Sequence, residues 1–180
     1  MLQITVPSSE RWDEAKEEFV YTDGQTLQLE HSLVSLSKWE SKWCKPFLSS
    51  KNLSDEEILD YIQCMTVTPN VQPEVYFGLT TENLSQVLQY INAPMTATTF
   101  REDNNGKRNR EVITAEIIYY SMVAYGIPFE CETWHLNRLL TLIRVCKIKN
   151  EPPKKRSSKD IMSEYAAINA ARRKAHNSKG

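Results

Sequence analysis

The apolar residues of this chain recur with the period of β-strands near the N-terminus and with the period of helices afterwards. Apolar and polar residues alternate over residues 2–6 and 26–30, as in strands with one buried face. Residues 19–21 form a further apolar run, and the Asp-Gly pair at 23–24 suits the positive-φ position of a hairpin turn. We therefore expect residues 19–21 to pair with residues 26–30, and the acidic stretch 10–18 to form a loop or one helical turn.

From residue 32 onward, apolar residues recur every three or four positions, which predicts a series of helices. The first three predicted helices each begin at a residue that can cap them: Ser32, Ser54, and Thr80 or Thr81. Ser54 is followed three residues later by Glu57, which is the spacing of a capping box. Residues 75–77 predict a short turn, and residues 100–110 predict a polar loop.

Two more helices are predicted over residues 111–125 and 132–149, and they contain the densest apolar surface of the chain. Gly126 readily ends the first of them, and Pro128 prevents that helix from restarting. We expect these two helices to pack antiparallel and to form the centre of the domain.

The charge pattern separates residues 150–180 from the rest of the chain. This segment has eight Lys or Arg and three acidic residues, a net charge of +5, whereas residues 1–149 carry −6. Two prolines within residues 151–153 predict an extended spacer, and a basic helix follows to about residue 176. An acidic body with a basic tail suggests that the tail meets an acidic surface, such as another subunit's body or nucleic acid.

These patterns together predict a mainly α fold, with a helical body, a small N-terminal β-hairpin or sheet and a C-terminal basic helix. We divide the chain into an N-terminal β region (1–31), a helical body (32–149), and a proline-containing linker with a basic amphipathic helix (150–180). A length of 180 residues suits a single domain with a tail.

The predicted C-terminal helix has a thin apolar stripe, which cannot hold a helix in isolation. Ile161, Tyr165 and Ile168 form this stripe at i, i+4 and i+7. The helix must therefore dock on its own body, dock on a neighbour or stay partly disordered. We assign partner binding to the stripe together with the basic residues around it: Lys154, Lys155, Arg156, Arg172, Arg173 and Lys174. A single aromatic residue, Tyr165, offers no platform for base stacking, so we do not expect nucleic acid as the partner.

Trp39 and Trp43 stand one helical turn apart on the first predicted helix. Such a pair most often packs in the protein core. The alternative is an aromatic anchor for a partner protein, because tryptophan is enriched at the energetic centres of interfaces. The sequence leaves both interpretations open.

The sequence contains no motif that indicates catalysis, a cofactor or a metal. It lacks the glycine-rich phosphate-binding patterns and the G-x-S-x-G nucleophile pattern. Cys131 and His135 would share one helix face at i and i+4, but no spacing signature supplies the other ligands of a zinc ion. We therefore expect His135 to be a satisfied or surface histidine and the four scattered cysteines to be buried thiols. No enzyme, cofactor or metal site is expected.

The distribution of apolar residues also bears on where the protein acts. The longest apolar run is shorter than the ~18 residues that a membrane-spanning helix needs. The N-terminus lacks the basic start and the apolar region of a secretory signal. We therefore expect that the protein does not contact a membrane. We expect it to act in the cytoplasm, where it is made.

Several short stretches of the chain carry a resemblance to a known family. They are residues 29–33, 37–43, 95–98, 127–131, 134–140, 149–150, 152–155 and 169–174. On these stretches the chain resembles the tail assembly chaperones, a family of small proteins from long-tailed bacteriophages. The resemblance covers most of the chain from about Leu27 onward and is strongest over residues 134–140.

The resemblance implies a non-enzymatic assembly factor in the host cytoplasm whose partners are phage tail proteins. Members of this family are made in a short form and a frameshifted longer form, and they coat the tape measure protein before tail tube subunits replace them. An acidic body, a proline spacer and a basic amphipathic tail suit self-association and reversible multivalent coating. The alternative is a structural virion protein of the phage tail or neck, such as a ring-forming adaptor, which a β-hairpin followed by helices would also suit.

Overall fold

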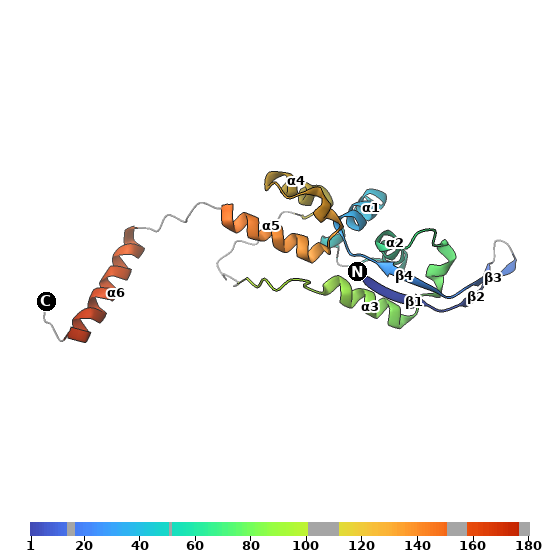
Figure 1. The fold of residues 1–180 in the computed structure, drawn as a ribbon, viewed down its shortest axis with the longest axis horizontal. Helices are drawn as coiled ribbons and strands as arrows, with labels where there is room; N and C mark the ends of the chain where they lie inside the picture. Colours follow the sequence, from blue (N-terminus) through green and yellow to red (C-terminus); the bar gives the residue numbers. More distant parts are fainter. Residues whose placement is uncertain (14–16, 51, 101–111, 151–157, 177–180) are drawn as a thin grey trace. The chain divides into compact units, whose positions relative to one another are not determined.

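The computed structural model describes residues 1–13, 17–50, 52–100, 112–150 and 158–176 (Figure 1). Over these residues the chain is mostly helical, with small antiparallel β-sheets at its N-terminus. This confirms the predicted fold class. The chain divides into two compact units, Met1–Lys147, which we call the body, and Ile148–Gly180.

The N-terminal strands form a two-stranded antiparallel ribbon. The strands are β1 (Leu2–Val6), β2 (Ser9–Asp13), β3 (Glu18–Thr22) and β4 (Gln25–Leu29). β1 pairs with β4 and β2 pairs with β3, with Val6 opposite Gln25 and Ser9 opposite Thr22, so one register continues through both pairs. The expected pairing of residues 19–21 with residues 26–30 is therefore wrong. The expectation of a loop or helical turn at 10–18 is also wrong, because β2 and the start of β3 occupy its described ends.

The Asp-Gly pair at 23–24 lies at an interruption of the ribbon and not at its turn. Pro7 stands on the opposite strand and has no N–H to donate, so the ladder of hydrogen bonds stops there. A Cβ added to Gly24 would lie 3.1 Å from the backbone nitrogen of Ser8 and 3.2 Å from the carbonyl oxygen of Val6. Glycine suits this position because a Cβ there would crowd the opposite backbone, and not because of a hairpin turn.

Five helices and three short 3-10 helices follow among the described residues up to Asn150. The helices are α1 (Leu33–Trp43), α2 (Asp55–Met65), α3 (Thr81–Asn92), α4 (Ala115–Ala124) and α5 (Leu136–Asn150), and the 3-10 helices are η1 (Phe47–Ser49), η2 (Pro73–Gly78) and η3 (Phe129–Thr133). The predicted caps are confirmed for α1, α2 and α3, where Ser32, Ser54 and Thr80 each accept a hydrogen bond from the backbone N–H three residues on. The turn predicted at residues 75–77 lies inside η2.

The α4 helix begins at Ala115, later than the expected residue 111, because a distant carboxylate caps it. The buried Glu40 side chain of α1 accepts the N–H of Ala115 through Oε2 at 2.7 Å and the N–H of Phe47 through Oε1 at 2.9 Å. These two hydrogen bonds satisfy a carboxylate that would otherwise be costly to bury. Gly126 has a φ of 65° directly after the helix, as the prediction of a glycine stop requires.

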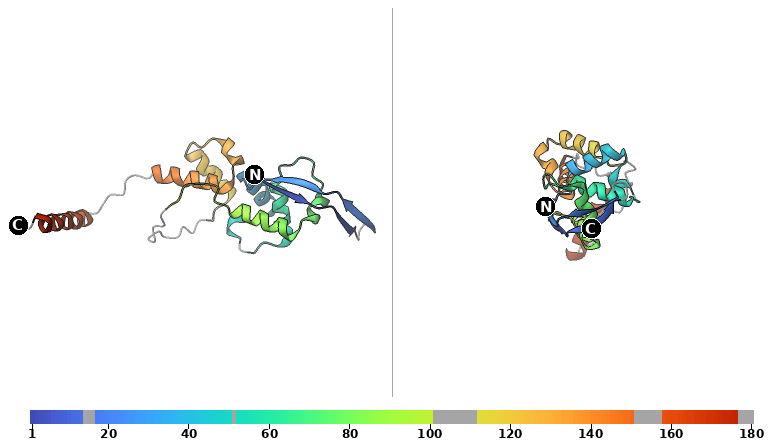
Figure 2. Two further views of the ribbon diagram at one scale, coloured as in Figure 1. Left: turned by 60° about the horizontal axis from the view of Figure 1, so that its bottom comes forward. Right: turned by 90° about the vertical axis from the view of Figure 1, so that its right-hand side faces the viewer.

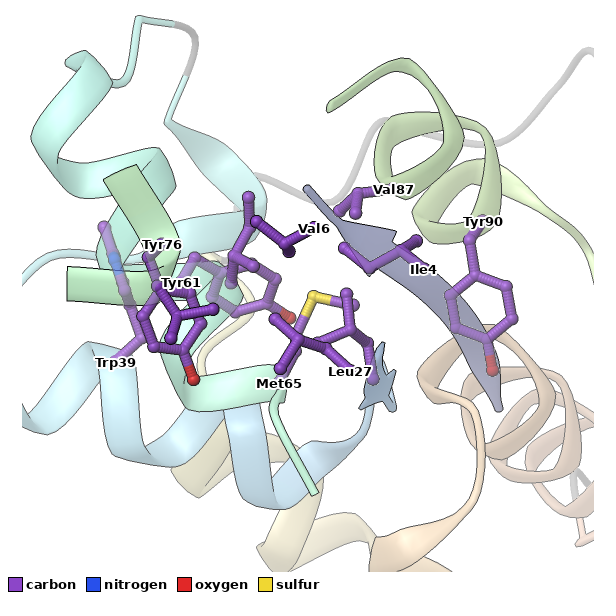
Figure 3. Close-up of a cluster of buried hydrophobic side chains, with 12 residues drawn as sticks. Ile4, Val6, Leu27, Trp39, Tyr61, Met65, Tyr76, Val87 and Tyr90 are labelled. Atoms are coloured by element: carbon purple, nitrogen blue, oxygen red, sulfur yellow. The ribbon is translucent and has the colours of Figure 1, made fainter. Parts of the chain in front are cut away.

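Two clusters of buried apolar residues form the core, and α1 contributes to both. The first cluster lies between the β1–β4 pair and the helices α1, α2, α3 and η2 (Figure 3). The second joins Leu33 and Leu36 of α1 to residues of α4, η3 and α5, including Met122 and Leu139. The expectation that α4 and α5 form the centre is wrong, since both contribute to the second cluster alone.

The second unit contains α6 (Ser158–His176). The predicted spacer at 151–153 lies outside the described residues, as does all of the predicted polar loop except Phe100. Among the helices that the structure describes, none has both the length and the apolar character needed to cross a membrane.

Candidate functional site

Trp39 is a core residue and has no surface to offer a partner. Its side chain is fully buried in α1, and its ring lies edge-on against Phe47 and Tyr61. The indole Nε1–H donates a hydrogen bond of 2.9 Å to the backbone carbonyl of Glu57. The hypothesis that Trp39 anchors a partner is therefore wrong, because both its apolar ring and its polar group are already satisfied inside the body.

Trp43 lies on the next turn of α1 and is half-buried. Its Nε1–H donates to Oδ2 of Asp60 in α2 at 2.8 Å, and the ammonium of Lys42 forms an ion pair with the same carboxylate. The ammonium groups of Lys42 and Lys45 lie 5.9 and 5.7 Å from the centre of the Trp43 ring. Trp43 thus joins α1 to α2 beside two lysines that are each paired with a carboxylate of α2. Its role in partner binding stays a prediction.

A second ion pair fixes the start of α2 to the end of α1. Lys45 pairs with the carboxylate of Glu57, which is also the capping-box residue of α2. The hydrogen bond from Lys45, followed by the one from the backbone of Ser54, lowers the pKa of Glu57 from its ordinary value. These contacts are structural, because they complete a helix cap and an inter-helix pair.

The predicted partner-binding residues of the C-terminal segment fall into two groups. Tyr165, Ile168, Arg172, Arg173 and Lys174 are all exposed on α6, and Ile161 belongs to the same helix. Lys154, Lys155 and Arg156 lie outside the described residues. The structure therefore places the predicted apolar stripe and the basic cluster of residues 172–174 on one helix.

An apolar groove in the body was not predicted. It has a volume of about 460 Å³ and is bounded by α2, α3 and the segment around η1. Its lining is mainly apolar and consists of Phe47, Ser50, Asn52, Leu53, Ile58, Tyr61, Ile62, Leu84, Val87, Leu88 and Ile91. Leu84, Val87, Leu88 and Ile91 all recur at the spacing of a core-facing side of a helix, but Leu88 is 54% exposed and Val87 is buried. Helical spacing alone cannot distinguish an apolar residue in a groove from one in a core.

A second apolar surface follows the outer side of α4. Tyr120 and Val123 stand one turn apart on this helix and are 72% and 64% exposed, and Phe129 in η3 is exposed as well. The opposite side of α4 buries Ile118 and Met122 in the second core cluster. The sequence of α4 is apolar on nearly every side, and the described part of the body covers the side that carries Ile118 and Met122.

The β2–β3 end of the ribbon carries a third group of exposed aromatic residues. Trp12 and Phe19 face each other across the two strands with ring centres 4.9 Å apart, and Tyr21 donates a hydrogen bond to Glu10. All three aromatic side chains are exposed. Figure 2 shows this end of the ribbon extending past the helices of the body.

Two buried histidines meet where the starts of α1 and α5 approach the end of α3. The rings of His31 and His135 are 5.2 Å apart. His31 Nδ1 lies 2.6 Å from the hydroxyl of Tyr61, and His135 Nε2 lies 3.0 Å from the carbonyl oxygen of Tyr90. Because that carbonyl can only accept, His135 carries its proton on Nε2, and Nδ1 accepts the N–H of Asn137 at 3.3 Å.

Burial sets the protonation of this pair. Burial, with a smaller effect from the charge of His135, lowers the pKa of His31 to about 3, and burial also lowers the pKa of His135. Both rings are therefore neutral at pH 7. The backbone carbonyl of His31 accepts the N–H of Leu136. This hydrogen bond joins the start of α1 to the start of α5, beside the two rings. Both ring nitrogens of His135 have a hydrogen-bond partner, so the expectation of a satisfied histidine is confirmed. The contacts of the two histidines hold helices of the body together.

The cysteines do not adopt the arrangement considered for a metal. Cys131 is buried in η3, whereas His135 lies before the start of α5. The expectation that the two residues share one helix face is therefore wrong. Cys44 is exposed and Cys64 and Cys146 are half-buried, so the expectation that all four thiols are buried is wrong. Over the described residues, no group of three or more His, Cys, Asp or Glu side chains is placed to hold a metal ion.

Comparison with known proteins gives no relative for this chain. No protein-family model, no curated protein and no solved structure matches it.

Proposed function

We propose that this protein is a non-enzymatic phage tail assembly chaperone, which binds the tape measure protein in the host cytoplasm during tail formation. The family assignment rests on the resemblance of the sequence stretches given above. The structural observation that supports it best is the apolar outer side of α4, where large side chains face solvent on a folded body.

The α4 surface has the character of a protein-binding surface. Scattered exposed apolar residues are normal on a soluble protein, but apolar side chains gathered along one helix mark an interaction site. Tyr120 and Val123 occupy adjacent turns, with Phe129 exposed shortly after the helix and Ile113 exposed just before it. An amphipathic helix of a client would supply matching apolar residues at i, i+3, i+4 and i+7.

A chaperone that coats a long client must bind reversibly and at many points. Contacts of modest strength give strong overall binding when several are linked, and each one can still be displaced by a competing subunit. The exposed apolar side chains on and beside α4 are few, so one contact made by them would be of modest strength.

Co-purification with the tape measure protein tests the proposal. We expect the pair Tyr120→Glu and Val123→Glu to abolish co-purification after co-expression, because each change places a charge where an apolar contact is needed. Gln89→Glu, at an exposed position of α3, is the matched control and should co-purify as the wild type does. Both variants should keep the wild-type melting temperature, and full co-purification by the α4 variant would refute this binding surface.

The exposed aromatic residues of the ribbon favour a second candidate, a structural adaptor of the tail or neck. Over the described residues, the projecting β2–β3 pair has no further strand at either edge, and such edges can pair with strands of a neighbouring subunit in a ring. Mass spectrometry of purified virions distinguishes the two functions. A chaperone is absent from the particle, whereas an adaptor is present in the stoichiometry of a ring.

A further inference from the structure

We propose that α6 of one copy of this protein binds the α2–α3 groove of a second copy. The proposal concerns the chain alone and goes beyond the proposed function, because it requires no client. It assigns a ligand to the groove and a binding site to α6.

The groove suits an apolar helix. Ile58 of α2 and Leu84 and Ile91 of α3 line it and are half-buried, and Leu88 adds a side chain that is 54% exposed. Two hydroxyls line the groove, and both are engaged within the body: that of Tyr61 with His31, and that of Ser50, which donates to the backbone carbonyl of Pro46. A ligand without polar groups on its bound side would therefore leave neither hydroxyl unpaired.

The α6 helix presents an apolar stripe of the required spacing. Tyr165 and Ile168 are 63% and 41% exposed, and Ile161 stands one turn earlier at the i position of an i, i+4, i+7 series. Helix-in-groove recognition uses anchors at this spacing. Four alanines flank the stripe, and their small side chains let a helix approach an apolar surface closely. The flanking residues are Ala166, Ala167, Ala170 and Ala171.

The charges of the two surfaces are complementary. The first turn of α2 follows the groove residue Leu53 and carries the exposed Asp55 and Glu56. The last turns of α6 carry Arg172, Arg173 and Lys174, all exposed. The net charges of the two parts of the chain also have opposite signs: −6 for residues 1–149 and +5 for residues 150–180. Opposite charges at the edge of an apolar contact steer two copies together and fix their orientation.

A second copy is the partner because every copy carries both surfaces, and both are exposed in the single chain. Leu88 in the groove is 54% exposed, and Tyr165 and Ile168 on α6 are 63% and 41% exposed. Each copy would offer one groove and one helix, and such a heterologous contact produces open chains or rings.

Two complementary variants of the full-length protein test the proposal. Leu88→Glu places a charge in the groove, and Tyr165→Glu places a charge on the stripe. The matched controls are Gln89→Glu, which is exposed beside the groove but does not line it, and Ser163→Glu, on the other side of α6. Sedimentation velocity of the purified proteins, without any client, reports their association over a range of concentrations.

We expect wild type and both controls to form larger species as concentration rises, and each groove or stripe variant alone to remain monomeric. An equimolar mixture of Leu88→Glu and Tyr165→Glu should form dimers and nothing larger, because the two variants together retain one intact helix and one intact groove. High salt should weaken wild-type association, since it screens the exposed charges.

Three results would overturn the proposal: a wild type that stays monomeric at every concentration, a Leu88→Glu or Tyr165→Glu protein that alone assembles as the wild type does, or a mixture of these two that stays monomeric. A monomeric wild type includes the case in which α6 binds its own groove. The proposed function is judged separately, because its test measures co-purification of a client with variants of α4 and not of α6 or the groove.

Discussion

The α3 and α6 helices are both amphipathic, and they differ in what covers their apolar side. α3 spans Thr81–Asn92 and buries Val87 and Tyr90 in the core of the body. α6 is the longer helix, at 19 residues against 12, yet Met162, Tyr165 and Ile168 on it are exposed. Length and helical period are therefore not what anchors a helix in this protein.

The difference shows where each helix obtains its stability. Most of the stability of a protein helix comes from packing of its apolar side and not from intrinsic helix propensity. α3 receives that packing from the β1–β4 pair and from α2, within its own body. α6 exposes the same kind of side chain, so a surface that covers it would stabilise the helix and the assembly together.

The largest expected effect separates the core from α6 directly. Leu139→Ala should lower the free energy of unfolding of the body by about 2–5 kcal/mol, because it removes a fully buried side chain. Ile168→Ala is the matched change on α6 and should leave the body's unfolding unchanged. Urea denaturation followed by circular dichroism measures both. A Leu139→Ala protein as stable as wild type would show that the second core cluster does not hold the body together.

The second expected effect is a loss of body stability on mild acidification. His31 is neutral in the folded protein because burial lowers its pKa to about 3, whereas in the unfolded chain its pKa is near 6.5. The unfolded state therefore binds more protons below pH 6.5, and stability falls as the pH falls toward 3. Between pH 7 and pH 5 the loss from His31 is about 2 kcal/mol, and the lowered pKa of His135 acts in the same direction.

Urea denaturation at pH 7, 6 and 5 measures this dependence, and His31→Gln is its control. The glutamine cannot titrate but can still bond to the hydroxyl of Tyr61, so the variant should lose less stability over the same interval. Equal pH dependence in both proteins would assign the effect to other groups.

The smallest expected effect is that of removing α6. A chain that ends at Asn150 should unfold cooperatively at nearly the wild-type melting temperature in dilute solution, since both core clusters lie within the body. Differential scanning calorimetry measures this. A broad or absent transition in the shortened chain would mean that α6 is part of the body's core.

Local sequence signals predicted much of the helical part of the fold. A capping side chain acts within three residues of itself, so Ser32, Ser54 and Thr80 could be identified without knowledge of the tertiary structure. The strand pairing could not be predicted in this way. Asp23 and Gly24 favour a turn locally, but the pairing of β1 with β4 depends on contacts between residues far apart in sequence.

The candidate surfaces were less predictable than the helices that carry them. Trp39 and Leu88 both occupy apolar positions of helical period, yet one is fully buried and the other is 54% exposed. The outer side of α4 presents the same difficulty, because Tyr120 and Met122 lie on a helix that is apolar nearly all round. Which side faces the core depends on the packing of whole helices, and the sequence period alone does not contain that information.

Hydrogen exchange of the α6 amides at several protein concentrations tests most directly whether a second copy covers this helix. The account predicts that α6 exchanges quickly in dilute solution and more slowly as the concentration rises, while the amides in the middle of α1 stay protected throughout. Tyr165→Glu should abolish the slowing, and Ser163→Glu should preserve it. Exchange in α6 that is the same at every concentration would contradict the account.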